Sequence, residues 1–139
     1  MAADDAAVLL SRDGLFLLHR LAVEAGNVAG YRSPTAEERA AVEGLRRVRA
    51  PLRGIRERLR HGQDGPAPAS PGEGEAAVRL VRADADAVVL SLPAAVLGEV
   101  LAGAAAVHRS LGDDELRTRT GCSPAECAAL LARLHAGLP

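Results

Sequence analysis

Aromatic side chains are nearly absent from this sequence, and their scarcity limits the kind of core that the chain can build. Hydrophobic residues make up 48% of the 139 residues, but Phe16 and Tyr31 are the only aromatic ones. Leu, Val and Ala must therefore fill the core, and each of them buries less apolar area than an aromatic ring does. Because small side chains reach native packing density only when backbones approach closely, we expect tightly packed helices. The length allows one compact domain or two very small ones.

A stretch rich in Pro, Gly, Ala and Ser divides the chain. Residues 61–75 contain almost nothing that could be buried, which is typical of a flexible linker or a long loop. This predicts an N-terminal unit over residues 1–60 and a C-terminal unit over residues 76–139. We expect an α+β fold, mainly α, in which each small helical unit carries one or two short strands. Whether strands pair between the two units is left open by the sequence.

The N-terminal unit begins with the sequence AAVLLS, which predicts a short buried strand over Ala6–Ser11. Ser11 is suited to cap a helix, and the apolar residues that follow recur at helical spacing. We therefore expect a helix over Arg12–Ala25, with Gly26 as its natural stop.

Two starts are open for the next helix. Ser33 and Pro34 fit the N-cap and the first helical position, where proline is favoured. Thr35 and Glu38 offer a capping box slightly later, in which each side chain bonds the other residue's backbone N–H.

Two β-rich runs around the sequence ADAD open the C-terminal unit and predict a β-hairpin at about residues 77–91. The hairpin would pair Ala77–Arg82 with Ala87–Ser91, although its turn lacks the Asn-Gly or Asp-Gly pair that favours tight hairpins. Three helices are expected after the hairpin: Pro93–Arg109, a short one near Asp113–Thr120, and a last one over Pro124–Ala136.

The two halves resemble each other in part. The sequence AVLLS at Ala7–Ser11 is echoed by AVVLS at Ala87–Ser91, and a later helix begins with Ser-Pro in each half. Two interpretations stay open: a degenerate duplication, or chance similarity in a chain built from few residue types.

The stretch Val42–Arg60 predicts a bent or broken helix with one apolar seam. Pro51 removes a backbone donor and favours a kink, but it also suits the start of a renewed helix. The seam runs past it at spacings of three and four: Leu45, Val48, Leu52, Ile55 and Leu59. A second row with the same spacing flanks the seam, and we call it the arginine stripe: Arg46, Arg49, Arg53, Arg56 and Arg60.

The arginine stripe has two interpretations. Evenly spaced guanidinium groups suit contacts with phosphates or with a carboxylate-rich partner. Alternatively, the arginines form a solvated helix flank whose aliphatic stems cover the edge of the seam. No aromatic residues alternate with them, so the base stacking used by single-strand binders is not indicated.

The stretch ELRTRTGCSPAECAALLARL, Glu115–Leu134, resembles the helix-turn-helix of bacterial regulators, including the last region of sigma factors. Gly121 makes the turn, Ser123 and Glu126 form a capping box, and Pro124 fits the first helical position. We expect a helix-turn-helix-like C-terminal helix pair.

The resemblance would imply DNA reading by the last helix, but two features depart from it. Arg117 stands where the family usually has Ala for close packing. Base readout also needs polar side chains on the outward face. The expected outward residues are mostly alanine, which suits helix–helix contact better: Ala125, Glu126, Ala128, Ala129, Ala132 and Arg133.

No catalytic or metal-binding pattern stands out. Cys122 and Cys127, with His135 and His108, could be imagined as zinc ligands, but their spacing is not one that structural zinc sites use. We expect both cysteines to be small core residues. No histidine accompanies a nucleophile motif, and no glycine-rich phosphate loop is present. The sequence predicts no enzyme, no metal and no cofactor.

Targeting signals are also not indicated. The start MAADDAAVLL contains two acids and no basic region, unlike a secretory signal. The longest apolar run, Leu92–Val107, is interrupted by Glu99 and is short for a bilayer span. Two cysteines without a signal fit a reducing compartment, so we expect a cytoplasmic protein with no membrane partner.

Every basic side chain is Arg, and with abundant Ala, Gly and Pro this indicates GC-rich coding, as in an actinomycete. The net charge of −1 gives no general attraction to nucleic acid. We expect a non-catalytic regulatory or interaction protein that binds another protein through Ala- and Leu-rich helix faces, which would also allow a homodimer. The alternative is a DNA-associated transcriptional regulator that holds phosphates with the arginine stripe. The expected contact surfaces are that stripe and the helix Pro93–Arg109, where Gly98, Gly103 and Ala104–Ala106 permit close packing.

Overall fold

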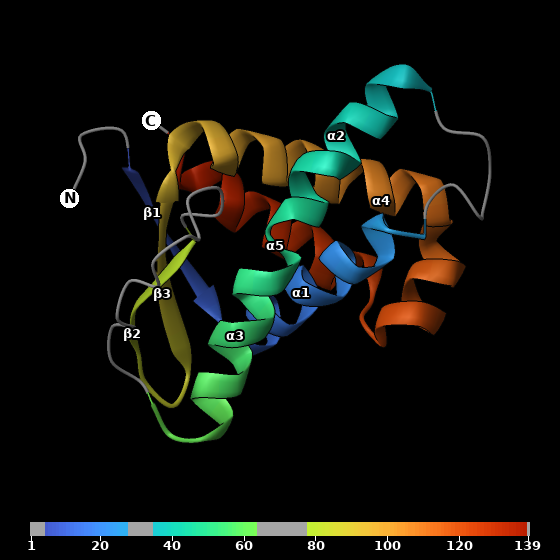
Figure 1. Cartoon of the computed structure of the whole chain (residues 1–139). Coiled ribbons are helices and arrows are strands. Elements are labelled where there is room, and N and C mark those ends of the chain that lie inside the picture. Colours follow the sequence, from blue (N-terminus) through green and yellow to red (C-terminus); the bar gives the residue numbers. More distant parts are fainter. Residues whose placement is uncertain (1–4, 28–34, 64–77, 139) are drawn as a thin grey trace.

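A three-stranded antiparallel sheet lies beside a larger group of helices (Figure 1). The computed structural model describes residues 5–27, 35–63 and 78–138. Strands β1 (Asp5–Ser11), β3 (Ala87–Pro93) and β2 (Arg79–Ala83) are adjacent in that order, so β3 is the central strand. Helices contribute most of the described elements, which confirms the expected α+β fold, mainly α.

The pairing of β1 with β3 joins the two halves of the chain in one sheet. Ala7 lies opposite Ser91, and Ser11 lies opposite Ala87. The two segments with similar sequence, AVLLS and AVVLS, are therefore antiparallel partners of each other. Both strands have one face on the core and one face outward, so each alternates between inward and outward residues. Membership of the same sheet explains why their sequences are similar. One continuous hydrophobic core contains residues from both halves.

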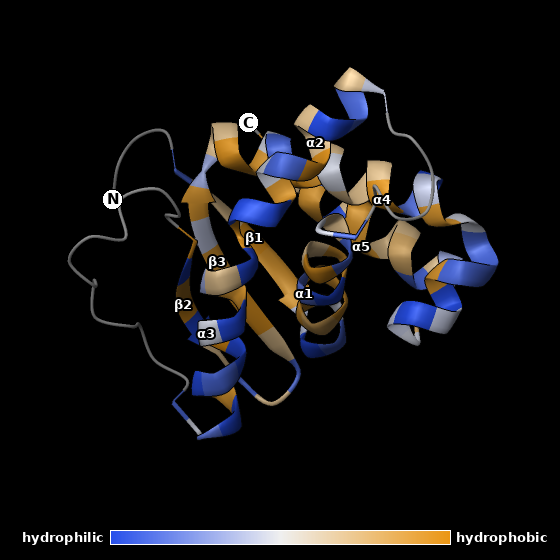
Figure 2. Cartoon of the chain, turned by 45° about the vertical axis from the view of Figure 1, so that its right-hand side comes forward, coloured by the Kyte–Doolittle hydropathy of each residue, from blue (hydrophilic) through white to orange (hydrophobic). Residues whose placement is uncertain are grey.

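The sheet packs one face on the helices. Inward residues such as Val8, Leu10, Val88 and Leu90 are at most 2% exposed. On the other face Leu9 is 49% exposed. Figure 2 shows hydrophobic residues along the strands and hydrophilic ones on the outward side of α3.

The predicted hairpin is confirmed, and an aspartate supplies its turn. The Asp84 carboxylate accepts hydrogen bonds from the backbone N–H groups of Asp86 and Ala87, each at 2.8 Å. These bonds lower the pKa of Asp84 and replace the missing Asn-Gly signal. Arg12 at the start of α1 also donates to the Asp84 carbonyl at 2.7 Å, which ties the turn to the N-terminal half.

Helix α1 (Arg12–Ala25) has the predicted bounds. The Ser11 side chain accepts from the N–H of Gly14, and Gly26 caps the other end. Helix α2 (Ala36–Arg47) begins at the later of the two predicted starts, because Thr35 and Glu38 form a complete capping box.

The earlier start at Ser33 and Pro34 is wrong, since the N-cap of α2 is Thr35. Ser33 and Pro34 themselves lie outside the described residues.

The expected break in the arginine-bearing helix lies at Val48 and not at Pro51. Val48 ends α2 with φ −90° and ψ 0°, and α3 follows over Arg49–Arg60. Pro51 falls in the first turn of α3, where a helix has no use for the missing N–H. The apolar seam crosses the break as predicted: Leu45, Val48, Leu52 and Ile55 are buried, and Leu59 is partly buried.

Helix α4 (Ala94–Thr120) combines two predicted helices into one element. Its N-cap is Pro93, so its first residue is Ala94, one residue later than the expected start at Pro93. Gly112 interrupts it with φ 77° and ψ 170°, at the place where we expected one helix to end and a short second one to follow. Gly121 then makes the predicted turn at φ 74°, and α5 (Pro124–Ala136) has the predicted bounds.

Helix α4 is the central helix of the core. By length and composition alone it is also apolar enough to cross a membrane, which the shorter run Leu92–Val107 did not suggest. Helices α1, α2 and α5 pack on it, and Leu97, Val100 and Val107 are at most 1% exposed. The same apolar face thus serves the protein's own core.

Candidate partner-binding surfaces

An open groove of about 620 Å³ lies between α2 and α4. We call it the α2/α4 groove. The charged residues Glu43, Arg47 and Glu99 also line it. Its other lining residues are all small, three from each helix: Ala40, Ala41 and Gly44 from α2, and Ala95, Gly98 and Ala102 from α4. Glu99 of α4 already fills the space at Gly44, since a Cβ there would lie 2.6 Å from the Glu99 Cβ. The alanines and Gly98 leave room for another backbone to approach closely.

The small residues predicted as a contact face of α4 divide into two groups. Gly103 serves the protein's own fold: a Cβ there would lie 2.6 Å from the Ala41 carbonyl oxygen and 2.6 Å from the Leu45 Cβ. Ala104 is fully buried beside it, so this part of the expected contact surface is not available to a partner. Gly98 differs, because a Cβ added there meets nothing within 4 Å. Gly98 therefore leaves open space on the groove side of α4.

The structure does not keep the arginine stripe as one row. Arg46, Arg49 and Arg53 line a second open hollow of about 470 Å³. Arg56 instead turns to α1. Its guanidinium lies 4.6 Å from the centre of the Phe16 ring, and it donates a hydrogen bond to His19 Nδ1 at 2.7 Å.

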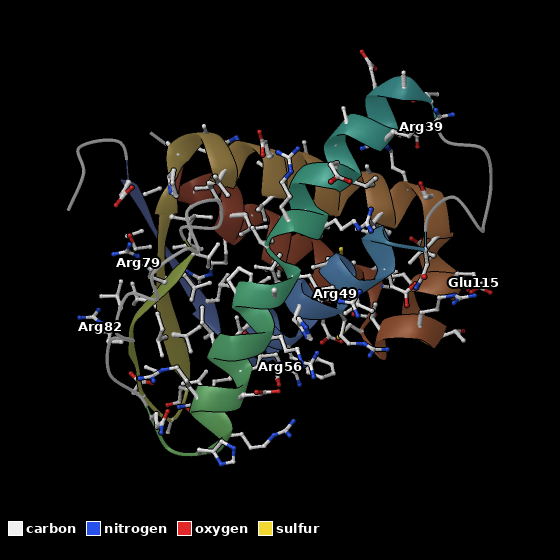
Figure 3. The ribbon with its side chains drawn as sticks, viewed as in Figure 1. Arg39, Arg49, Arg56, Arg79, Arg82 and Glu115 are labelled. Carbon is white, nitrogen blue, oxygen red and sulfur yellow. The ribbon has the colours of Figure 1, made fainter. Side chains whose placement is uncertain are left out.

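Carboxylates pair with only part of the stripe. Glu43 lies 3.7 Å from Arg46, and Glu57 lies 3.5 Å from Arg53. Within the part of the chain that the structure describes, Arg49, Arg56 and Arg60 have no ion pair. Four members of the stripe are exposed to solvent, whether or not they have an ion pair: Arg46, Arg49, Arg53 and Arg60. Figure 3 shows Arg49 on the α1 side of α3.

His19 is a residue that the sequence gave no reason to select. It is 9% exposed, and its Nδ1 accepts from Arg56, so Nε2 carries the proton. Among the described residues Nε2 has no hydrogen-bond partner. Burial lowers the pKa of His19, and the nearby guanidinium groups of Arg56, Arg49, Arg20 and Arg53 lower it further. The ring is therefore neutral at pH 7. The sequence places His19 three residues after Phe16 on the same helix. This spacing gains significance only in the structure, where Arg56 of α3 contacts both residues.

The C-terminal helix pair presents the outward face that we expected. Leu116 and Thr120 are buried, and the outward residues of α5 are exposed: Ala125, Glu126, Ala128, Ala129, Ala132 and Arg133. Small uncharged side chains thus cover most of the helix that a DNA-reading motif would use.

Both cysteines belong to the core, as predicted. Cys122 and Cys127 are free and buried, and burial raises the pKa of Cys127 to about 11. A thiol with so high a pKa is a poor nucleophile near neutral pH. Residues 5–27, 35–63 and 78–138 contain no group of three His, Cys, Asp or Glu side chains placed to hold a metal ion.

Comparisons with models of known protein families, with curated proteins and with solved structures found no match for this chain. Its function must be argued from the surfaces themselves.

Proposed function

We propose that this chain is a non-catalytic regulatory or interaction protein of the cytoplasm that binds another protein through the α2/α4 groove. The observation that carries the proposal is the groove's lining: six small residues from two packed helices, with Gly98 facing open space. Helix packing needs such short side chains where two backbones come close, and the fold already uses Gly103 in this way between α2 and α4.

The occupant that suits this groove is a helix. Its apolar stripe would cover the alanines, while Glu43, Arg47 and Glu99 at the groove would select its charges and its direction. A helix of a second copy of the chain would fit in the same way, so self-association belongs to the same proposal.

Affinity capture from the native host tests this function with two matched variants. Ala102→Arg places a long charged side chain in the groove, and Ala128→Arg makes the same change on exposed α5. A partner that is retained by the wild type and by Ala128→Arg, but lost by Ala102→Arg, supports the groove as the binding site. Retention of every captured protein by both variants would rule the groove out, and loss of binding by Ala128→Arg alone would place the contact on α5.

A DNA-associated regulator is the second candidate. The observation in its favour is the hollow between α2 and α3, where Arg46, Arg49 and Arg53 lie together. Glu57 lines the same hollow and would repel phosphates, which makes this the weaker proposal. Titration of random duplex DNA at increasing salt separates the two candidates. Binding that weakens steeply with salt supports the regulator, and no binding at low salt excludes it.

A further inference from the structure

Helices α1 and α3 together form a positively charged surface that lies apart from the α2/α4 groove. We call it the α1–α3 arginine surface. It combines part of the arginine stripe with residues of α1: Phe16, Arg20, Arg49, Arg53, Arg56 and Arg60. In Figure 3 Arg49 and Arg56 lie on α3 next to α1, whereas Arg79 and Arg82 lie on β2 away from them.

Four arginines of this surface act on one residue, His19. The guanidinium groups of Arg56, Arg49, Arg20 and Arg53 all lower the pKa of His19, after the larger effect of burial. Burial, Arg60 and Arg20 in turn lower the pKa of Arg56. Four arginines from two helices therefore place positive charge around one buried ring, and Arg60 adds positive charge beside Arg56.

The chain itself supplies little compensation. Among the described residues, only Arg53 of this group pairs with a carboxylate, that of Glu57 at 3.5 Å. Elsewhere the pattern differs, since Arg119 pairs with Glu115 at 3.0 Å and Glu43 lies within 4.0 Å of two arginines. An acidic partner would relieve the repulsion that the α1–α3 surface leaves in place.

The centre of the surface is preorganised. Arg56 is held between the Phe16 ring at 4.6 Å and His19 Nδ1 at 2.7 Å, so it has little side-chain freedom left to lose on binding. Phe16 is 38% exposed, although aromatic residues are scarce in this chain. Arginine and aromatic side chains are the types most often found where binding energy is concentrated.

We propose that the α1–α3 arginine surface is a docking site for an acidic segment of another protein, one that carries an apolar residue beside its carboxylates. The carboxylates pair with Arg20, Arg49 and Arg60, while the apolar residue covers the exposed edge of Phe16 next to Arg56. This site is separate from the groove, so each can be tested without the other.

Two features favour a protein segment over nucleic acid. Glu57 lies among the arginines and would repel a continuous row of phosphates but tolerates separate carboxylates. One face of the Phe16 ring is already occupied by Arg56, which hinders the base stacking that single-stranded nucleic acid uses.

Fluorescence anisotropy with three labelled probes of equal length tests the proposal on the full chain. The first probe is a peptide of Glu with interspersed Leu, the second has Ser in place of Leu, and the third is single-stranded DNA. We expect saturable binding of the Glu/Leu peptide, weaker binding of the Glu/Ser peptide, and the weakest binding of DNA. In a 15N-labelled sample the amide shifts should concentrate in α1 and α3.

Four variants locate the binding site. We expect Arg56→Gln and Phe16→Ala each to weaken binding of the Glu/Leu peptide by about fivefold or more. Arg60→Gln changes an exposed arginine that has no hydrogen bond or ion pair among the described residues. This change should weaken binding by about twofold or more even if Arg56→Gln disturbs the helices. Arg133→Gln on exposed α5 is the control with the same change of charge and should leave binding nearly unchanged.

Four results would overturn the proposal. One is an equal loss of binding in Arg133→Gln and Arg60→Gln, which would mean that only net charge matters. Another is tighter binding of DNA than of the Glu/Leu peptide through the same residues. The third is a dimer, seen by sedimentation, that Arg60→Gln and Phe16→Ala dissociate, because a second copy would then occupy the surface. Failure of all peptide binding while groove variants still lose a captured partner would reject this site and leave the proposed function standing.

Discussion

Arg56 donates a hydrogen bond to Nδ1 of His19 at 2.7 Å, and this bond links α3 to α1. The bond needs a neutral imidazole, because a protonated ring has no acceptor to offer. Burial keeps the ring in that state by lowering its pKa, and the surrounding arginines lower the pKa further. His19 on α1 therefore fixes the position of Arg56 on α3, a half-buried arginine of the α1–α3 surface.

This relationship predicts that His19 makes the fold sensitive to acid. The folded-state pKa lies below the ordinary value of 6.5, so the unfolded chain takes up the proton first as the pH falls. Stability is complete above pH 6.5 and decreases as the pH drops through the lowered pKa. Urea unfolding of the wild type between pH 8 and pH 5 should show this decrease. In His19→Gln, whose amide oxygen still accepts from Arg56, the decrease should be smaller, and an identical pH profile would contradict the role of His19.

Gly98 and Gly103 of α4 should respond in opposite directions to substitution by alanine. Gly103→Ala should lower the free energy of unfolding by about 1–3 kcal/mol, because its Cβ would overlap the Ala41 carbonyl and Leu45. Gly98→Ala should raise it by up to about 1 kcal/mol through better helix propensity, since nothing lies near its Cβ. Denaturant titration of both variants checks the pair. Equal changes in the free energy of unfolding for the two variants would contradict the close contact of Gly103 with α2.

The capping box at the start of α5 should contribute measurably to stability. Ser123 Oγ accepts from the N–H of Glu126, and the Glu126 carboxylate accepts from the N–H of Ser123, each at 3.1 Å. Ser123→Ala should cost about 1 kcal/mol of unfolding free energy, and Ser123→Gly only a few tenths. Thermal unfolding measures both variants. If Ser123→Gly is less stable than Ser123→Ala, the cap is not what stabilises this helix end.

Local signals were enough to predict most helix ends and the hairpin. Ser11, Thr35 and Ser123 each cap a helix with a side chain that hydrogen-bonds a backbone N–H three residues ahead, and this requires no information from elsewhere in the chain. The hairpin followed from its apolar runs, although the bonds of the Asp84 carboxylate that form its turn were not foreseen.

Features that depend on long-range packing could not be predicted. The pairing of β1 with β3 joins segments whose sequences had suggested a duplication, because strand alternation looks the same whether two segments are copies or partners. The regular spacing of the arginine stripe could not show how the expected break would orient its members. The break at Val48 and the docking of α3 on α1 separate Arg56 from Arg46 and bring it to Phe16 and His19.

Gly112 should tolerate substitution less well than Gly121, although a Cβ at Gly112 would meet no neighbour. Its φ of 77° with ψ of 170° belongs to a backbone region that is open almost only to glycine. Gly121 has φ 74° and ψ 6°, a left-handed conformation that asparagine also adopts. Gly112→Asn should therefore cost about 1–3 kcal/mol of unfolding free energy, and Gly121→Asn less than about 1 kcal/mol. Denaturant unfolding of the two variants measures the difference. Because the side chain added is the same and neither site is crowded, a larger loss at Gly112 can arise only from its backbone conformation. Equal losses would mean that the chain relaxes at Gly112 into an ordinary helix, so that α4 can run straight past the interruption.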